Sequence, residues 1–323
     1  MDVTKAEAHS AEDLANIFDA VARAGGAHTL NVAAAGGLRE AFALAGKQVL
    51  EERRAAGDEA LGLASHLALM LKNQGKLDEA RPMLEHVLAV RERTLGAEDE
   101  STLRTMNDLA IVLRQQGDLA AAREMFERTL KAKERALGAA HPSTLATMGN
   151  LASVLLQQGD LAAAREMYER TLKAQESALG TAHPETLMTM ANLAIVLKDQ
   201  GDLAAAREVN ERTLKAKERT LGAEHPSTLL TMGNLAGVLR DQGDLAAARE
   251  MQERTRKAQE RTLGAEHPST LNTMMNLAFL LENQGDLAAA RAMFERTLQG
   301  QERAMGAAHP HTQWTKNHLA EMR

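Results

Sequence analysis

The side chains that could do chemistry in this 323-residue sequence recur at a fixed spacing. Histidine, a common metal ligand, stands every 42 residues at His141, His183, His225, His267 and His309. Zinc ligands converge at about 2 Å from one ion, whereas equivalent atoms of stacked helical repeats lie on the order of 10 Å apart. Each of these histidines precedes a proline. We therefore interpret the His-Pro pair as the start of a helix and expect no metal site.

A second polar position recurs in front of a packing leucine. It holds Asn150, Asn192, Asn234 and Asn276, and it holds Asp108 in an earlier repeat. An amide at this position can donate hydrogen bonds to an extended peptide backbone and accept hydrogen bonds from it. It can also bond a neighbouring helix and hold the stack together. The sequence leaves these two interpretations open.

Catalytic patterns do not stand out from the repeats. We find no Ser–His–Asp arrangement, glycine-rich phosphate loop or HExxH sequence. The candidate serines, histidines and aspartates are each copied several times along the chain, whereas an active site needs one unique convergent cluster. We therefore expect neither enzymatic activity nor a cofactor.

The repeat itself is the main organising feature of the chain. Its turn glycine recurs every 42 residues, at Gly75, Gly117, Gly159, Gly201, Gly243 and Gly285. A fixed period of roughly 20 to 50 residues is typical of a solenoid, in which each unit packs only on its neighbours. A solenoid presents a long surface and has no single closed core, so the period favours a binding function.

Each repeat is predicted to form two helices, as the one around Gly159 illustrates. Pro142 lies just inside the first helix, where its missing N–H costs nothing, and Gly159 supplies the left-handed turn that ends this helix. Asp160 caps the second helix, which stops at Gly180. Apolar residues recur at helical spacing in both helices, so the pair forms an antiparallel hairpin with one face left to bury.

The apolar pattern of one repeat resembles the tetratricopeptide repeat. The bulky-x2-Leu-small-x2-bulky and Ala-x3-aromatic patterns of that family are met by Met148, Leu151, Ala152, Leu155, Ala164 and Tyr168. The 42-residue period, with LG-x2-HP, NLA and QGD at fixed places, resembles the kinesin-light-chain type. The resemblance, from about Asp58 onward, implies an all-α, right-handed superhelical α-solenoid of antiparallel helix pairs. It also implies a concave groove that binds a protein or an extended peptide segment.

Three regions are expected along the chain. Residues 1–57 form a degenerate N-terminal cap, with helices at Ser10–Ala24 and Leu38–Ala56 and a Gly/Ala-rich connection at 25–37; a dedicated interaction element is the alternative. Six repeats follow, at 58–99, 100–141, 142–183, 184–225, 226–267 and 268–309. Residues 310–323 are expected to be a capping helix, half of a seventh repeat.

We expect the partner-binding residues on the first helices, at the recurring asparagines and at positions that vary between repeats. Selection by a ligand would produce such variation, and drift on a solvated surface would produce it as well. The expected site residues are Lys72, Arg104, Asn107, Asp108, Arg114, Asn150, Asn192, Ile195, Lys198, Asn234, Arg240, Asn276 and Phe279. The charges predict a groove that is weakly basic at its N-terminal end and weakly acidic, through Glu282, at its C-terminal end.

The composition narrows the class of partner. The net charge of −6 argues against nucleic acid, whose phosphates need a basic face. The chain has no cysteine, so it has neither disulfides nor thiolate metal sites. No apolar run approaches the roughly 20 residues of a membrane span, and the acidic N-terminus does not resemble a secretory signal. We therefore expect a cytoplasmic protein that binds neither nucleic acid nor membranes.

Two repeats depart from the pattern in their second helix. Where other repeats carry Phe126, Tyr168 and Phe294, these two carry Asn210 and Gln252. Arg256 also replaces a leucine of the pattern. A lost aromatic or leucine contact costs roughly 2–5 kcal/mol in a packed core. The stack is therefore predicted to be weakest around residues 205–260.

These features together predict a scaffold or adaptor that binds a protein or peptide in its groove. One alternative is a self-assembling structural scaffold that associates through its terminal helices. Another is the sensor arm of a larger effector system. Neither the identity of the partner nor the oligomeric state follows from the sequence.

Overall fold

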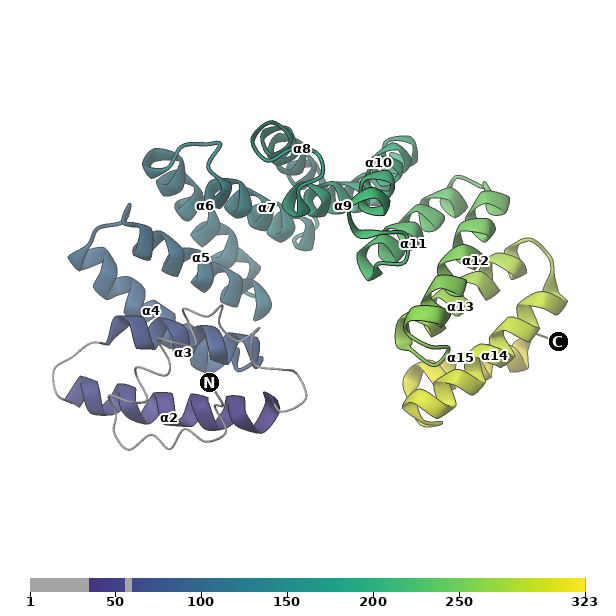
Figure 1. Ribbon diagram of the computed structural model, residues 1–323, viewed down its shortest axis with the longest axis horizontal. Coiled ribbons are helices and arrows are strands. Elements are labelled where there is room, and N and C mark those ends of the chain that lie inside the picture. Colours follow the sequence, from purple (N-terminus) through teal and green to yellow (C-terminus); the bar gives the residue numbers. More distant parts are fainter. Residues whose placement is uncertain (1–34, 56–59, 323) are drawn as a thin grey trace. The chain divides into compact units, whose positions relative to one another are not determined.

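The computed structural model of the protein describes residues 35–55 and 60–322, which contain helices and connecting turns and no strands (Figure 1). The first helices of the pairs are α3 (Leu61–Asn73), α5 (Glu100–Gln115), α7 (Pro142–Gln157), α9 (Pro184–Asp199), α11 (Pro226–Asp241) and α13 (Pro268–Asn283). The second helices are α4 (Leu77–Thr94), α6 (Leu119–Ala136), α8 (Leu161–Ala178), α10 (Leu203–Leu221), α12 (Leu245–Thr262) and α14 (Leu287–Met305). The all-α architecture of antiparallel helix pairs is as predicted.

One helix lies at each end of this series. The helix α2 (Ala35–Ala55) precedes the pairs, and α15 (Pro310–Glu321) follows them. The expected connection at 25–37 is too long, because α2 already begins at Ala35. The expected helix Ser10–Ala24 lies outside the described residues, as does the rest of that connection.

The chain divides into two compact units, Met1–Gln158 and Gly159–Arg323, which we call unit one and unit two. The division falls at a turn glycine, between α7 and α8. Within each unit every helix packs on the next one along the chain, from α2 to α7 and from α8 to α15. Each unit is therefore a stack of helices in which neighbours in sequence are neighbours in space.

Local side chains determine where the helices begin and end. His141 is the N-cap of α7, and its Nδ1 accepts a hydrogen bond from the Ser143 N–H at 3.2 Å, with Pro142 in the first turn. Asp160 caps α8 by accepting from the Ala163 N–H at 3.1 Å. The turn glycine before it, Gly159, has a φ of 80°, which favours a residue without a Cβ. The interpretation of His-Pro as a helix start is confirmed.

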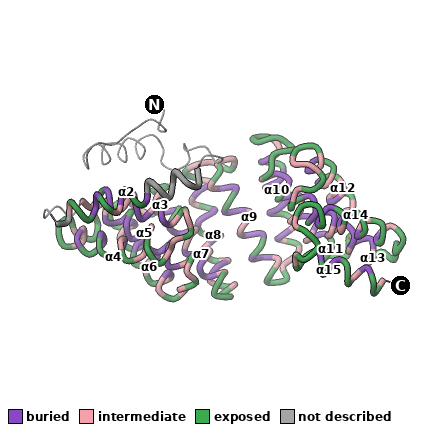
Figure 2. Tube along the Cα trace, turned by 90° about the horizontal axis from the view of Figure 1, so that it is seen from below, coloured by how far each residue is buried: buried purple, intermediate pink, exposed green. Residues whose placement is uncertain are grey.

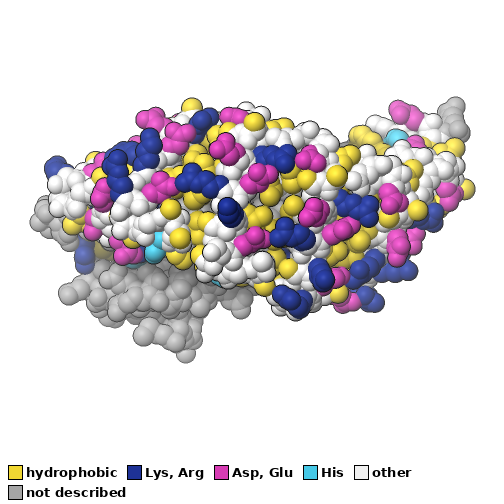
Figure 3. Space-filling view, turned by 90° about the horizontal axis from the view of Figure 1, so that it is seen from above, with side chains coloured by type: hydrophobic (Ala, Val, Ile, Leu, Met, Phe, Trp, Pro, Cys, Tyr) yellow, Lys and Arg dark blue, Asp and Glu magenta, His cyan; other side chains and the backbone are white. Residues whose placement is uncertain are grey.

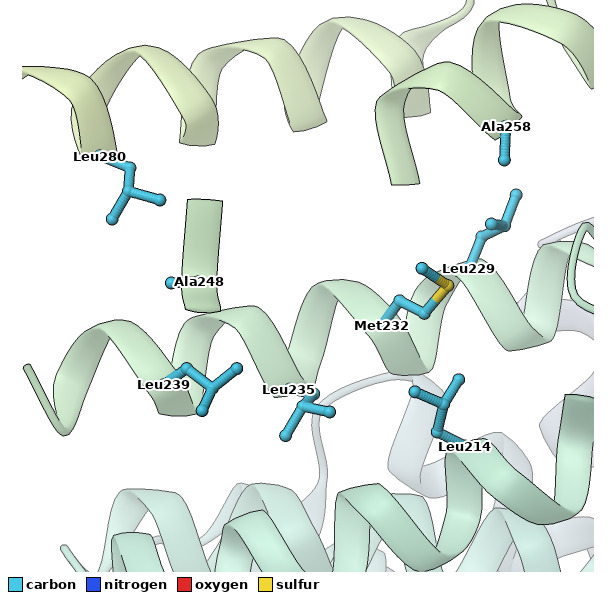
Figure 4. Close-up of a cluster of buried hydrophobic side chains, with 8 residues drawn as sticks. All are labelled: Leu214, Leu229, Met232, Leu235, Leu239, Ala248, Ala258 and Leu280. Carbon is cyan, nitrogen blue, oxygen red and sulfur yellow. The ribbon is translucent and has the colours of Figure 1, made fainter. Parts of the chain in front are cut away.

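The core lies between the helices and is built from leucine, alanine and methionine. Figure 2 shows the buried residues as stripes along the helices. A cluster in unit two is centred on four residues of α11 that contact the helices before and after it (Figure 4). It contains Leu214, Leu229, Met232, Leu235, Leu239, Ala248, Ala258 and Leu280. The single apolar stripe predicted for each first helix is thus its packing surface.

A buried polar contact also links each of several second helices to the following first helix. Lys133 of α6 donates to Thr147 Oγ1 of α7 at 2.9 Å, and Lys217 of α10 donates to Thr231 Oγ1 of α11 at 3.0 Å. Burial lowers the pKa of Lys133 to about 8, against the opposing charge of Asp108. Burial also lowers the pKa of Lys217. We call this contact the threonine link; the sequence analysis did not find it.

No helix in the described part of the chain is a candidate membrane span. None of the helices there combines the length with the apolar character that a bilayer crossing requires.

Candidate functional site

All thirteen expected site residues lie on first helices. Unit one holds six of them, Lys72, Arg104, Asn107, Asp108, Arg114 and Asn150. Unit two holds the other seven, Asn192, Ile195, Lys198, Asn234, Arg240, Asn276 and Phe279. The structure brings the residues of each unit together to different degrees, so the two sets are described separately.

Unit two has a cavity of about 300 Å³, the central hollow, formed by α9, α11 and α13 over α10 and α12. Five expected site residues line it: Ile195, Lys198, Asn234, Arg240 and Asn276. Glycines in the middle of α11 keep the space open, since a Cβ added at Gly233 would meet nothing within 4 Å. At Gly237 it would meet only Lys198 Nζ, at 3.9 Å. The hollow therefore results from missing side chains on one helix.

The floor of the central hollow is polar. Asn210 of α10 and Gln252 of α12 line it, and they are only 1% and 6% exposed. Asn210 Nδ2 donates to the Ala206 carbonyl at 3.0 Å. Among the described residues, Asn210 Oδ1 and Gln252 Oε1 have no hydrogen-bond partner. The sequence analysis identified these residues as weak points of packing but did not include them in the site.

The charges at the edge of the central hollow neutralise one another. Asp241 lies 3.3 Å from Lys198 Nζ and 2.8 Å from Arg240 Nη2. Burial raises the pKa of Asp241, but the hydrogen bond and charge of Arg240, together with Lys198, outweigh burial and hold the pKa below its usual range. Lys198 and Arg240 are therefore already paired, and they act as a neutralised edge more than as two free cations.

The recurring asparagines are half-buried and unbonded. Asn234 and Asn276 line the central hollow and also a second cavity of about 240 Å³ beside it, which shares Gly233 and Gln252. Neither they nor Asn150 and Asn192 make a hydrogen bond with any other residue that the structure describes. A stack-holding asparagine would need such a bond, so the geometry leaves these amides available to a ligand.

Unit one has a smaller cavity of about 180 Å³, the basic hollow, lined by His66, Arg91, Arg104 and Asp108 among others. Burial raises the pKa of Asp108, and the positive charges of Lys72, Arg104, Lys133 and Arg91 oppose this rise. The positively charged side chains around the basic hollow therefore outnumber its one carboxylate.

Two other expected site residues of unit one lie outside this hollow. Asn107 is half-buried, and its Oδ1 accepts a long 3.4 Å hydrogen bond from Thr147 Oγ1. Arg114 is half-buried, and its Nε has no partner among the described residues.

The end of unit two carries an apolar cavity of about 350 Å³, the aromatic hollow. Met275 and Phe279 of α13 line it together with Trp314 of α15. The Phe279 ring lies 5.2 Å from Phe294 and 5.4 Å from Trp314 between centroids. Trp314, which is 46% exposed, was not among the expected residues. It is the only tryptophan of the chain, and this singularity is the feature of the sequence that could have marked it as a site residue.

Charged side chains of both signs are interspersed elsewhere. Figure 3 shows Lys and Arg next to Asp and Glu, without a large patch of one sign on the face displayed. Arg165 and Glu169, for example, pair at 2.8 Å along α8. Within residues 35–55 and 60–322, no group of three or more His, Asp or Glu side chains is placed to hold a metal ion.

The comparisons with known proteins agree with the helix pairs and their spacing. The model of the tetratricopeptide repeat family matches residues 59–135, 131–177, 143–219, 185–260 and 227–303, which span well over half of the chain. The chain belongs to the tetratricopeptide repeat (TPR) family. Its repeats are of the 42-residue, kinesin-light-chain-like type.

Solved structures share this TPR fold. One is a Podosopora anserina protein, assigned as a kinesin light chain, whose TPR-like repeats are nearly identical to one another. Its sequence is 30% identical to this chain, and the two structures match with a TM-score of 0.57 over 63% of this chain and 96% of that one. BtubC (BKLC) from P. vanneervenii is 20% identical, with a TM-score of 0.59 over 78% and 95%. A TPR protein from Parabacteroides merdae is 14% identical, with a TM-score of 0.61 over 98% and 99%. No curated protein matches the sequence.

Proposed function

We propose that this TPR chain is a non-enzymatic scaffold or adaptor that binds an extended peptide segment of a partner protein along its first helices. The central hollow is the observation that carries the proposal, because five expected site residues on three first helices line one cavity. TPR folds generally mediate protein interactions. Helix-lined grooves recognise partners through a few anchors and through hydrogen bonds, and the unbonded asparagines offer the latter.

The hollow of each unit indicates a side chain that a segment bound in that unit would carry. The basic hollow of unit one suits an acidic side chain, because Arg91 and Arg104 line it together with one carboxylate, Asp108. The aromatic hollow of unit two suits an apolar side chain, because Met275, Phe279 and Trp314 line it. We expect a protein or peptide partner of this kind, neither nucleic acid nor membrane, and a cytoplasmic location for a chain without cysteine.

The proposal can be tested with a displayed library of random peptides selected on the full chain. A peptide of about ten residues spans roughly 30 Å when extended, which is enough to cross three helix layers of about 10 Å each. We expect enriched peptides whose affinity falls when Asn192, Asn234 and Asn276 are changed together to Ala. An unselective library, or peptides that bind the triple variant as tightly as the wild type, would contradict the proposal.

Self-association is a second candidate because of one observation. Trp314, on the last described helix α15, lines the aromatic hollow and is 46% exposed. Large exposed aromatic side chains around an apolar cavity are typical of interfaces. Light scattering at increasing protein concentration distinguishes the two functions. A mass that rises with concentration in the wild type, but not in a Trp314→Ser variant, would favour assembly through this end.

A further inference from the structure

We propose that unit two binds a proline-containing segment in the polyproline II conformation along one exposed row of side chains on its first helices. The inference deepens the proposed function and rests on it, because it names the conformation and the side-chain class of the bound segment. The row consists of the fifth residues of α9, α11, α13 and α15, and we call it the outer row. These residues are Met188, Leu230, Asn272 and Trp314.

The outer row exposes three large apolar side chains. Met188 is 60% exposed, Leu230 is 64% exposed and Trp314 is 46% exposed. Single exposed apolar side chains are ordinary on a protein surface, but these three occupy one and the same position of the repeat. In unit one this position holds Arg104 and Ala146. Unit two therefore offers one apolar contact on each of three helix layers, with a polar one at the layer between the last two.

Two cavities join the outer row from α11 to α15. Leu230 and Asn272 both line the cavity of about 240 Å³ beside the central hollow, which we call the side hollow. Asn272 and Trp314 both line the aromatic hollow of about 350 Å³. None of the described residues that line either cavity is Lys, Arg, Asp or Glu. A charged side chain would lose hydration here without gaining a counter-charge, so the row favours an uncharged segment.

The spacing of the outer row favours one backbone conformation. Its residues stand on helix layers about 10 Å apart. A polyproline II helix has three residues per turn with a rise of about 3.1 Å each, so it presents a side chain to the same face about every 9.3 Å. A β-strand presents one about every 7 Å, and it would lose register with the row after a single layer. Every third residue of a polyproline II segment can therefore contact successive residues of the row.

The amides beside the outer row favour this conformation over an α-helix. An α-helical partner also returns a side chain to the same face about every 10.5 Å, but its backbone groups are bonded within the helix. The backbone groups of a polyproline II segment are free. Asn192, Asn234 and Asn276 each follow a row residue by four positions and so lie one turn further along the same helix face. They bond no other residue that the structure describes, and a free peptide backbone would give them partners.

The aromatic hollow indicates proline at its end of the outer row. Grooves lined by aromatic side chains dock segments with the pattern Pro-x-x-Pro. The Trp314 ring stacks on His318, with 4.9 Å between centroids and 14° between planes, and lies 5.4 Å from the Phe279 ring. The indole is thus supported by other rings of unit two while part of it stays exposed. A proline ring can pack on this surface, and it brings neither a charge nor a backbone N–H to bury.

The test uses the fluorescence of the full chain, because Trp314 is its only tryptophan. Two peptides of equal length and composition are titrated, one with proline at every third position and one with proline at every second position, filled with serine and glutamine. A third peptide is an amphipathic helix with one leucine every seven residues. We expect the first peptide to move the Trp314 emission to shorter wavelength. It should bind at least about tenfold more tightly than the other two, because only it places an apolar group on each layer.

A matched pair of variants locates the contact. Leu230→Gln in α11 and Ala146→Gln in α7 place the same side chain at the same position of two repeats, one in the outer row and one in unit one. Both positions are exposed, so both variants should stay folded, which circular dichroism checks. Only Leu230→Gln should weaken binding of the first peptide, about fivefold or more. Equal affinities of the two variants would overturn the inference.

Three other results would also overturn it. The Trp314 emission could stay unchanged at saturation, or either of the other two peptides could bind as tightly as the first. The random library could also enrich peptides without proline or apolar residues at every third position, which would leave the proposed function standing. A library that enriches no peptide on the wild type would instead contradict the proposed function, and this inference with it.

Discussion

Lys133 shows how a single buried residue makes stability depend on pH. It is 4% exposed, and burial lowers its pKa from 10.5 to about 8. Below pH 8 the lysine is charged in both the folded and the unfolded chain, so the full cost of burying the charge is present. Between pH 8 and about 10.5 the unfolded chain binds the extra proton, and the free energy of unfolding therefore rises with pH.

We expect this rise to depend on Lys133 itself. A change to Gln, the residue found at the equivalent Gln175, Gln259 and Gln301, should remove a rise of about 2–3 kcal/mol at most. Urea unfolding at several pH values between 7 and 10.5 measures it. Lys131→Gln, on the exposed side of the same helix, is the control and should keep the wild-type slope. Equal slopes in the wild type and Lys133→Gln would show that the buried lysine does not control this pH dependence.

The recurring asparagines give a second prediction at this scale. Changing Asn150, Asn192 and Asn234 together to Ala should abolish binding of a selected peptide while leaving helicity and the melting temperature nearly unchanged. The physical reason is that these half-buried amides bond no other residue in the described part of the chain. Peptide titration and circular-dichroism melting measure the two effects. A sharp drop in melting temperature would instead assign the asparagines to holding the stack.

At the scale of helices, α10 and α12 are predicted to be the weak elements of unit two. Asn210 and Gln252 are inside the core and not on the outer surface, and Arg256, whose side chain is 14% exposed, pairs with Glu260 at 2.7 Å. Each replaces a residue that would otherwise pack, at a cost of roughly 2–5 kcal/mol. In a solenoid the stability is close to a sum over neighbouring interfaces, so such costs remain local.

Hydrogen exchange should therefore show amides of residues 205–260 opening before those of the second and third repeats. Mass spectrometry of the native protein measures this repeat by repeat. Restoring a ring by Asn210→Phe should slow the exchange of α10 and raise the melting temperature. Uniform protection along the chain is the result that would refute the weak region.

The N-caps allow a matched test on one helix start. His225 caps α11 through an acceptor nitrogen, and the equivalent Asp99 caps α5 by accepting from two N–H groups. His225→Ala should lower the free energy of unfolding by about 1 kcal/mol, whereas His225→Asp should leave it unchanged or raise it. Thermal unfolding of the two variants measures the difference. Equal losses in both would mean that the histidine acts through packing and not as a cap.

For the molecule as a whole, the sequence predicts the fold far better than the site. Helix starts, turns and apolar stripes depend on neighbouring residues, and each signal is repeated several times, so errors average out. The first helix of the described chain has no repeated signal at its start. The sequence predicts that it begins at Leu38, whereas α2 begins at Ala35. The central hollow joins α9, α11 and α13 to a floor from α10 and α12. Its two floor residues lie 42 positions apart in sequence, and only the packed structure shows that they share a cavity.

A last prediction concerns the charge of the ligand that the whole chain selects. Arg104 lines the basic hollow, and Arg114 makes no ion pair with a described residue. Exposed charge pairs are worth at most about 1 kcal/mol each, so the effect should be salt sensitivity more than tight affinity. Reversing both arginines to Glu should weaken an acidic peptide and flatten the salt dependence of its affinity. Unchanged binding at low salt would remove this end from the site.

The threonine link has a consequence for how such a gene can change in length. Lys133 and Lys217 each bond a threonine 14 residues further on, Thr147 and Thr231, in the repeat that follows. The two contacts are equivalent, although a whole repeat separates the two lysines. Both joints are thus of the same kind. Recombination between near-identical stretches of DNA that removes 42 codons would rejoin compatible surfaces and preserve the fold. The central hollow would not survive loss of the repeat that contains Gly233, so shortened alleles would stay folded while their binding preference changed.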